Sequence, residues 1–170
     1  MDRVIDISLD NIERAIKAID DYKRELPQKV NEFRKRLGDE LASMAQSGFN
    51  SAMIDDLTRG GGRTPNVTVS ADDDGKICIV VANGEDAVWC EFGAGVYHNG
   101  SVGSSPHPQG ASLGYTIGSY GKGYGKGKAW GYVENGVLNI TRGSPASMPM
   151  YNAMKEIIAK ADTIAREVWK

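Results

Sequence analysis

The stretch NVTVSADDDGKICIVVAN, residues 66–83, decides which kind of fold the chain can adopt. Its first six residues alternate between apolar and polar side chains, and the next four are three aspartates and a glycine. The last eight form a nearly continuous apolar run. Alternation with a period of two, interrupted by turn residues, predicts two β-strands joined as a hairpin. The sheet part of the fold therefore begins here, after a long segment with a different periodicity.

The turn of this first hairpin sets the register that we expect. A two-residue turn at Asp74 and Gly75 would pair Val69 with Val80. The second strand, residues 76–83, carries apolar side chains on both faces. This pattern predicts a strand that lies inside the sheet with both faces covered.

A second hairpin is predicted by WGYVENGVLNIT, residues 130–141. The Asn-Gly dipeptide at its centre is typical of a two-residue type I′ turn, which needs a positive φ at both turn positions. The resulting register places Val133 opposite Leu138 and Trp130 opposite Thr141.

Helical periodicity dominates the two ends of the chain. Ser8 is a candidate N-cap for the first apolar stripe, and Pro27 predicts a kink or a new helix start. Pro149 suits the first turn of a C-terminal helix. The apolar positions are Leu9, Ile12, Ile16, Ile19 and Leu26 before Pro27, Val30, Phe33, Leu37, Leu41 and Met44 after it, and Met154, Ile157, Ile158, Ala161, Ile164 and Val168 near the C-terminus.

Together these elements predict an α+β fold: long N-terminal helices, a small, mostly antiparallel sheet of two hairpins with a long glycine-rich inserted loop, and a C-terminal helix. A chain of 170 residues is expected to form a single domain. The expected segments are a helical arm or hairpin (1–57), a hinge (58–65), the first hairpin and a turn (66–97), a flexible loop (98–127), the second hairpin (128–143) and the C-terminal helix (147–169).

Composition excludes several classes of protein. The net charge of −2 argues against a general nucleic-acid binder, whose domain would normally be basic. No apolar run approaches the roughly 20 residues that span a bilayer, and the N-terminus lacks the apolar core of a signal peptide. We therefore expect no membrane partner. Two cysteines allow one disulfide at most, so we also expect reduced thiols in a cytoplasm.

The segment GSYGKGYGKGKAWGY, residues 118–132, closes a stretch from Gly93 to Lys128 that contains no acidic residue. Its glycines and lysines could suggest a phosphate-binding loop. The spacing matches neither GxxxxGK followed by Ser or Thr nor GxGxxG, and a strand rather than a helix follows. We therefore reject a nucleotide site.

A thiol-dependent hydrolase is another possibility, with Cys90 as nucleophile and His98 or His107 as base. Both histidines lie in a glycine- and serine-rich loop with no obvious carboxylate to orient them, and the same residues match no structural zinc spacing. The sequence therefore predicts no catalytic, cofactor-binding or metal-binding residues.

Two interpretations of the glycine-rich loop remain, because its aromatic and basic residues alternate. The pattern resembles a single-strand nucleic-acid binder, although so few lysines neutralise little phosphate. Alternatively, the loop orders only against a partner protein, where tyrosines supply contact area. We favour this second interpretation and name residues 98–127 the assembly loop. Its candidate contact residues, with the start of the next strand, are Tyr115, Tyr120, Lys122, Tyr124, Lys126, Lys128 and Trp130.

Three blocks of sequence occur in an order that resembles a known family. VWCEFGAGVY (88–97) precedes the glycine-rich insertion, WGY begins the second hairpin, and TRGSPASMPMYNAMKEI (141–157) leads into the last helix. This order resembles the tail-completion, or head–tail joining, proteins of long-tailed bacteriophages, over roughly residues 65–160. The chain departs from the family pattern at Ala94, where threonine is expected, at Met148 before Pro149, and in lacking a phenylalanine between Pro149 and Met150.

The resemblance implies a structural virion protein of the tail and neck, made in the host cytoplasm, and not an enzyme. It implies self-association as a six-fold ring, with the tail tube and the head or neck connector proteins as partners and incidental DNA contact as an alternative. The residues carried over from the family motifs form two turns. The first turn launches the loop (Glu91, Phe92, Gly93, Gly95), and the second is the sheet-to-helix junction (Thr141, Arg142, Gly143, Pro145, Pro149, Met150).

Overall fold

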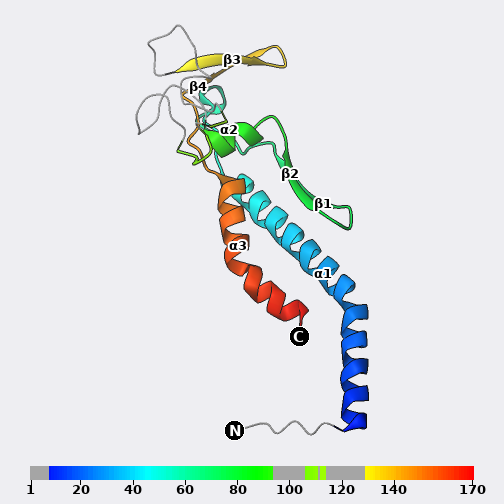
Figure 1. Cartoon of the computed structure of the whole chain (residues 1–170). Helices are drawn as coiled ribbons and strands as arrows, with labels where there is room; N and C mark the ends of the chain where they lie inside the picture. The colour runs from blue at the N-terminus through cyan, green and yellow to red at the C-terminus, as the bar shows by residue number, and fades with distance from the viewer. Residues whose placement is uncertain (1–7, 94–105, 111, 114–128) are drawn as a thin grey trace.

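The computed structural model of the chain describes residues 8–93, 106–110, 112–113 and 129–170 (Figure 1). The fold is α+β, with a long N-terminal helix, two antiparallel hairpins and a C-terminal helix. In addition, it contains a short 3-10 helix, η1 (Leu57–Arg59), and a short α-helix, α2 (Ala87–Phe92). The sequence patterns did not predict these two short elements.

Helix α1 (Leu9–Ser51) runs through the proline that was expected to interrupt it. The Ser8 side chain accepts a hydrogen bond from the Asn11 N–H, at 3.3 Å, and so caps the helix as predicted. Because α1 continues through Pro27, the prediction that a new helix could start there is wrong. Proline removes one intrahelical hydrogen bond and crowds the preceding turn, which bends a helix. Figure 1 shows the dark blue N-terminal part of α1 set at an angle to the rest.

Helix α3 (Pro149–Val168) runs antiparallel to the C-terminal half of α1 and packs against it (Figure 1). Its end lies beside the middle of α1, where the rings of Phe33 and Trp169 meet edge to face with centroids 5.4 Å apart. Arg36 and Glu167 form an ion pair of 2.6 Å at the same place. The buried residues of this helical core are Leu41, Ala45, Ala153, Ile157, Ile164 and Val168.

The first hairpin, β1 (Thr68–Asp73) and β2 (Cys78–Asn83), has a different register from the one expected. Val69 pairs with Ala82 and not with Val80. The turn is longer because Asp74 accepts hydrogen bonds from the backbone N–H groups of Lys76 and Ile77. This side-chain contact stabilises a four-residue turn at 74–77, and the pairing shifts by two positions.

Strand β2 does not lie inside a sheet, so that expectation is also wrong. Among the described residues it has one neighbouring strand, and its side chains alternate between the helices and solvent. Val80 packs against the helical core, whereas Ile77 and Ile79 on the other face are 61% and 58% exposed. Apolar residues on both faces of a strand predict two covering layers, but the described chain supplies only one.

The second hairpin, β3 (Trp130–Glu134) and β4 (Val137–Thr141), has the predicted register. Trp130 pairs with Thr141, and Val133 pairs with Leu138. Asn135 and Gly136 both have positive φ, at 51° and 77°, as a type I′ turn requires. The two hairpins form separate two-stranded sheets rather than one sheet.

Candidate functional site

Most of the predicted assembly loop lies outside the described residues. The same is true of His98 and Gly95, and of the loop's tyrosines and lysines: Tyr115, Tyr120, Lys122, Tyr124, Lys126 and Lys128. Trp130 begins β3, where its backbone pairs with Thr141. The site is therefore built from the two family-motif turns, from their surroundings and from the exposed apolar faces.

Glu91, in the last turn of α2, caps the beginning of α3. Its two carboxylate oxygens accept the backbone N–H groups of Met150 and Tyr151, at 2.8 and 2.9 Å. The N-cap residue of α3 is Met148, which has a φ of 53° and makes no side-chain cap. A carboxylate from a distant segment therefore satisfies donors that a helix normally caps locally, at the positive end of the helix dipole.

The backbone reinforces this junction. The carbonyl oxygen of Cys90 accepts the N–H groups of Ser147 and Met148, at 2.8 and 3.2 Å. Gly93 ends α2 with a φ of 83°, a conformation that favours glycine. The two motif blocks, whose hydrogen-bonded residues Glu91 and Met150 are 59 positions apart in sequence, thus form a single joint.

His107 completes the joint, which corrects the expectation that no carboxylate orients either histidine. Its Nε2 lies 3.1 Å from Glu91 Oε1, and its Nδ1 accepts the N–H of Gln109 at 3.0 Å. We therefore assign the proton to Nε2, which donates to Glu91. The two side chains are only 3% and 9% exposed, and the His107 ring packs on Phe92 and Tyr151.

Cys90 lies in a second apolar cluster and not in a reactive environment. The cluster comprises Phe49, Ala52, Ile54, Val67, Ala87 and Cys90. Burial raises the pKa of the Cys90 thiol to about 12, which keeps it protonated at neutral pH. Both ring nitrogens of His107 are engaged by Glu91 and Gln109. This geometry offers no support for a nucleophile–base pair of Cys90 and His107, and His98 lies outside the described residues.

The second motif turn surrounds Asp55, just beyond the end of α1. Arg142 Nη2 lies 2.6 Å from Asp55 Oδ1, and the Thr141 hydroxyl donates to the Asp55 carbonyl oxygen at 2.7 Å. Ser144 Oγ accepts the Asp55 N–H at 3.0 Å. The hydrogen bond from Arg142 lowers the pKa of Asp55 below its ordinary value. These contacts hold the end of β4 against the segment that follows α1.

The remaining motif residues continue from β4 to α3. Gly143 has a φ of 93° and donates its N–H to Thr141 Oγ1 at 2.9 Å. Pro145 is exposed, and Pro149 is buried as the first residue of α3. A Cβ on Gly48 would lie 2.9 Å from Pro149 Cβ, so this glycine lets α1 and α3 approach closely.

The segment 58–65, which was expected to be a hinge, is bound to the rest of the chain by an ion pair. The sequence analysis did not identify this pair. The guanidinium of Arg63 binds both carboxylate oxygens of Asp86, at 2.5 and 2.8 Å. Asp86 also accepts the N–H of Asn66 at 2.8 Å, and Arg63 pairs with Ile54 in an isolated β-bridge. A single Arg–Asp pair 23 residues apart has no recognisable spacing.

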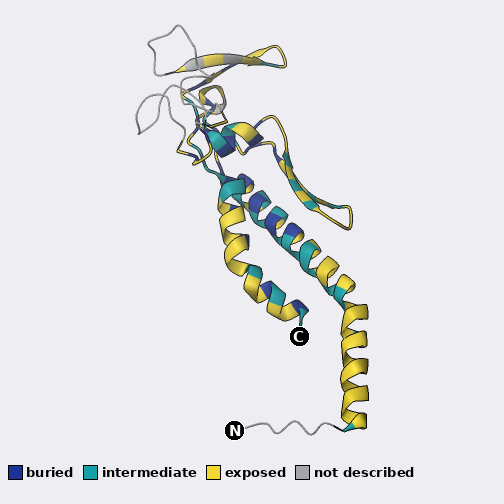
Figure 2. Cartoon of the chain, in the orientation of Figure 1, coloured by how far each residue is buried: buried dark blue, intermediate teal, exposed yellow. Residues whose placement is uncertain are grey.

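Large apolar side chains are exposed as groups on three elements. On the N-terminal part of α1, Leu9, Ile12, Ile16 and Ile19 are between 44% and 80% exposed (Figure 2). The outer face of β2 exposes Ile79 and Val81, next to the exposed Ile77 of the turn. The second hairpin exposes Val133, Val137, Leu138 and Ile140. Groups of exposed apolar side chains mark interaction surfaces more often than isolated apolar residues do.

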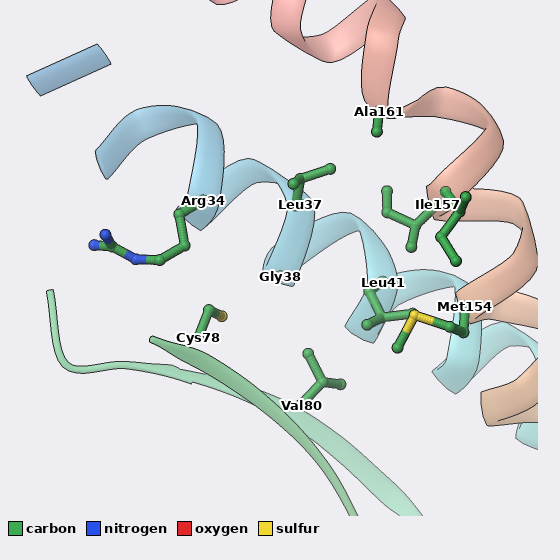
Figure 3. A pocket seen from close by; sticks show the side chains of 10 residues that line it. Arg34, Leu37, Gly38, Leu41, Cys78, Val80, Met154, Ile157 and Ala161 are labelled. Carbon is green, nitrogen blue, oxygen red and sulfur yellow. The ribbon is translucent and has the colours of Figure 1, made fainter. Parts of the chain in front are cut away.

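A groove of about 290 Å³ lies where α1, α3 and β2 meet (Figure 3). Leu37, Leu41, Val80 and Ile157 contribute apolar walls, and Arg34 lies at one end, held by Asp73 at 2.9 Å. Gly38 permits the hairpin to lie close to α1, because a Cβ there would meet the Cys78 sulfur. The lining offers apolar contact and little polar chemistry.

No cluster of three or more potential metal ligands occurs among the described residues. Within the same part of the chain, no helix is both long and apolar enough to cross a membrane. Comparison of the chain with protein-family models, with curated proteins and with solved structures found no match.

Proposed function

We propose that the chain is a structural subunit of a bacteriophage virion that completes the tail and joins it to the head or neck. In this proposal the subunits form a ring, contact the tail tube and the connector proteins, and carry no catalytic site. The observation that carries the proposal is the set of exposed apolar faces on α1, β2 and the second hairpin. A subunit that buries these faces only in an assembly would expose them when isolated.

The motif geometry supports the same proposal. The residues that resemble the family motifs make contacts within the chain: Glu91 caps α3, and Arg142 binds Asp55. Such residues hold a scaffold together rather than form a reaction centre. A scaffold held by such contacts can present its exposed apolar faces in defined directions.

DNA contact in the neck is the alternative. A local cationic arm would bind phosphate even in a protein of net charge −2. Against this, many of the described arginines are already paired with carboxylates, which reduces their attraction for phosphate: Arg24, Arg34, Arg36, Arg63, Arg142 and Arg166.

The decisive experiment removes the protein from phage assembly. A nonsense mutation in its gene should yield filled heads and free tails under the electron microscope. Adding the purified wild-type protein to that lysate should restore infectious particles. Complete particles assembled without the protein would contradict the proposal.

A binding assay separates the two functions. Binding to duplex DNA, measured between roughly 0.05 and 0.5 M NaCl, should be weak throughout if the protein acts through apolar contacts. Tight binding that falls steeply with salt would favour the DNA-contacting alternative.

A further inference from the structure

The apolar side chains of α1 follow a seven-residue repeat over the first thirty residues of the helix. Steps of three and four alternate, so that the first and fourth positions of each heptad form one seam. A strict 3.5-residue spacing differs from the 3.6 residues of a straight helix and is typical of helices that pair with another helix. The seam consists of Leu9, Ile12, Ile16, Ile19, Lys23, Leu26, Val30, Phe33 and Leu37.

A helix of the same chain already covers the last part of this seam. Phe33 and Leu37 pack against the core that α1 forms with α3, and Trp169 contacts Phe33. Helix α3 ends at Val168, beside the middle of α1, and the N-terminal part of the seam continues past that end, exposed (Figures 1 and 2). The apolar seam of α1 therefore packs against α3 in its C-terminal part, whereas its N-terminal part extends beyond α3.

We propose that residues Leu9–Leu26 of α1 pair with the same segment of a second copy as an antiparallel two-stranded coiled coil. Lys23 determines the direction, because it occupies a seam position. In a parallel pair, the two Lys23 side chains would face each other. In an antiparallel pair, Ile16 lies opposite the partner's Ile19, and Leu9 lies opposite the partner's Leu26.

Charge complementarity supports this antiparallel alignment. Lys23 then lies opposite the partner's Ile12 and next to the partner's Glu13. Its own Asp20 is on the same flank, one turn away. The lysine thus sits between two carboxylates that would otherwise face each other across the pair. Tyr22 and Ala15, on the opposite flank, carry no charge.

The bend at Pro27 limits the paired segment. Eighteen residues of helix span about 27 Å. Two-fold pairing closes at two copies and generates no ring, so it involves a different contact from the cyclic assembly proposed above. The inference therefore stands or falls independently of the proposed function.

The experiment compares two aspartate substitutions on opposite sides of the same helix. Ile16→Asp places a charge in the centre of the seam, whereas Ala18→Asp places the same charge on the outer face. Sedimentation equilibrium of the full chain, from roughly 1 to 500 µM, should show a wild-type dimer that Ile16→Asp weakens at least about tenfold. Ala18→Asp should pair as the wild type does.

A monomeric wild type over the whole concentration range would overturn the inference, as would an Ile16→Asp chain that pairs normally. A six-fold species that is insensitive to Ile16→Asp would also overturn it, while supporting the proposed ring. Circular dichroism should show that both variants keep the fold, because both positions are exposed.

A charge exchange tests the alignment. Lys23→Glu alone should weaken pairing about tenfold at low salt, and adding Glu13→Lys to the same chain should restore most of the loss. In a Cys78→Ser background, Ile12→Cys and Lys23→Cys chains should form a disulfide when mixed. Efficient cross-linking of either variant with itself alone would indicate a parallel pair and contradict the proposal.

Discussion

The two halves of α1 have nearly the same apolar pattern and opposite environments. From Phe33 onward, the apolar stripe is covered by α3 and by the first hairpin, and Leu41 and Ala45 are buried. Before Pro27, the stripe is exposed from Leu9 to Ile19. A stripe therefore predicts that a helix has a partner, but it does not say whether the partner belongs to the same chain. Here the length of α3 makes the difference.

The largest expected effect compares equivalent positions of the two halves. Leu41→Ala should lower the free energy of unfolding by about 2–4 kcal/mol, because it leaves a cavity between α1 and α3. Ile16→Ala should change the free energy of unfolding by less than about 0.5 kcal/mol when the chain is monomeric. Urea denaturation at low protein concentration measures both values. Equal losses would mean that the N-terminal half is packed against the rest of the chain.

The next effect concerns the cap of the helix that covers α1. Glu91→Ala should cost about 2–3 kcal/mol, because it leaves the first N–H groups of α3 and the buried His107 without their acceptor. Glu156→Ala, which removes an exposed ion pair with Lys160 on the same helix, is the control. Its cost should stay below about 0.5 kcal/mol in the same urea titration. If the two costs were alike, the cap would contribute little to the junction.

Replacing Pro27, at the boundary between the two halves of α1, should make their helical stability more alike. Proline in a helix interior costs up to about 3 kcal/mol relative to alanine, so Pro27→Ala should stabilise the helix locally. Because the half before Pro27 is largely exposed in the described part of the chain, the gain should appear there. Hydrogen exchange should slow severalfold for the amides before position 27, while the amides of the buried half change little. Unchanged exchange before position 27 would show that the proline does not limit this half.

The smallest effect is a pH dependence of stability at Asp55, just beyond the C-terminal end of α1. The folded-state pKa of Asp55 is lowered, so its contribution is present above the unfolded pKa of about 3.9 and is lost as the pH falls through the folded value. Asp55→Asn should therefore cost about 1 kcal/mol at pH 7, and this difference should shrink below about pH 4.

Thermal unfolding at several pH values measures this dependence. Asp162→Asn, which removes an exposed ion pair with Arg166, is the control and should cost less than about 0.5 kcal/mol at pH 7. A cost for Asp55→Asn that stays constant from pH 7 to pH 3 would contradict a lowered pKa as its source.

Local signals in the sequence predicted the elements well. The Asn-Gly dipeptide determines the second hairpin, because the conformation that it requires is a property of two adjacent residues. The first hairpin was predicted with the wrong register, since Asp74 selects a longer turn through its side chain. The exposed face of β2 was also mispredicted, because apolar composition does not reveal how many layers cover a strand.

The junction at Glu91 could not be predicted in the same way. Its partners His107 and Met150 are 16 and 59 residues away, and each is an ordinary residue in its own segment. The resemblance identified the blocks that meet there but not the contact between them. Only the folded chain shows that the end of α2 caps the start of α3.

The antiparallel arrangement of α1 and α3 also has a consequence during synthesis. Leu41 leaves the ribosome 116 residues before Ile157, its partner in the core. At roughly 5–20 residues per second, this interval lasts roughly 6–23 s. The apolar face of α1 around Leu41 therefore stays exposed in the nascent chain until α3 has been synthesised, and folding depends on contacts of high sequence separation. A chaperone that shields this surface should raise the yield of native protein more than one that acts after release.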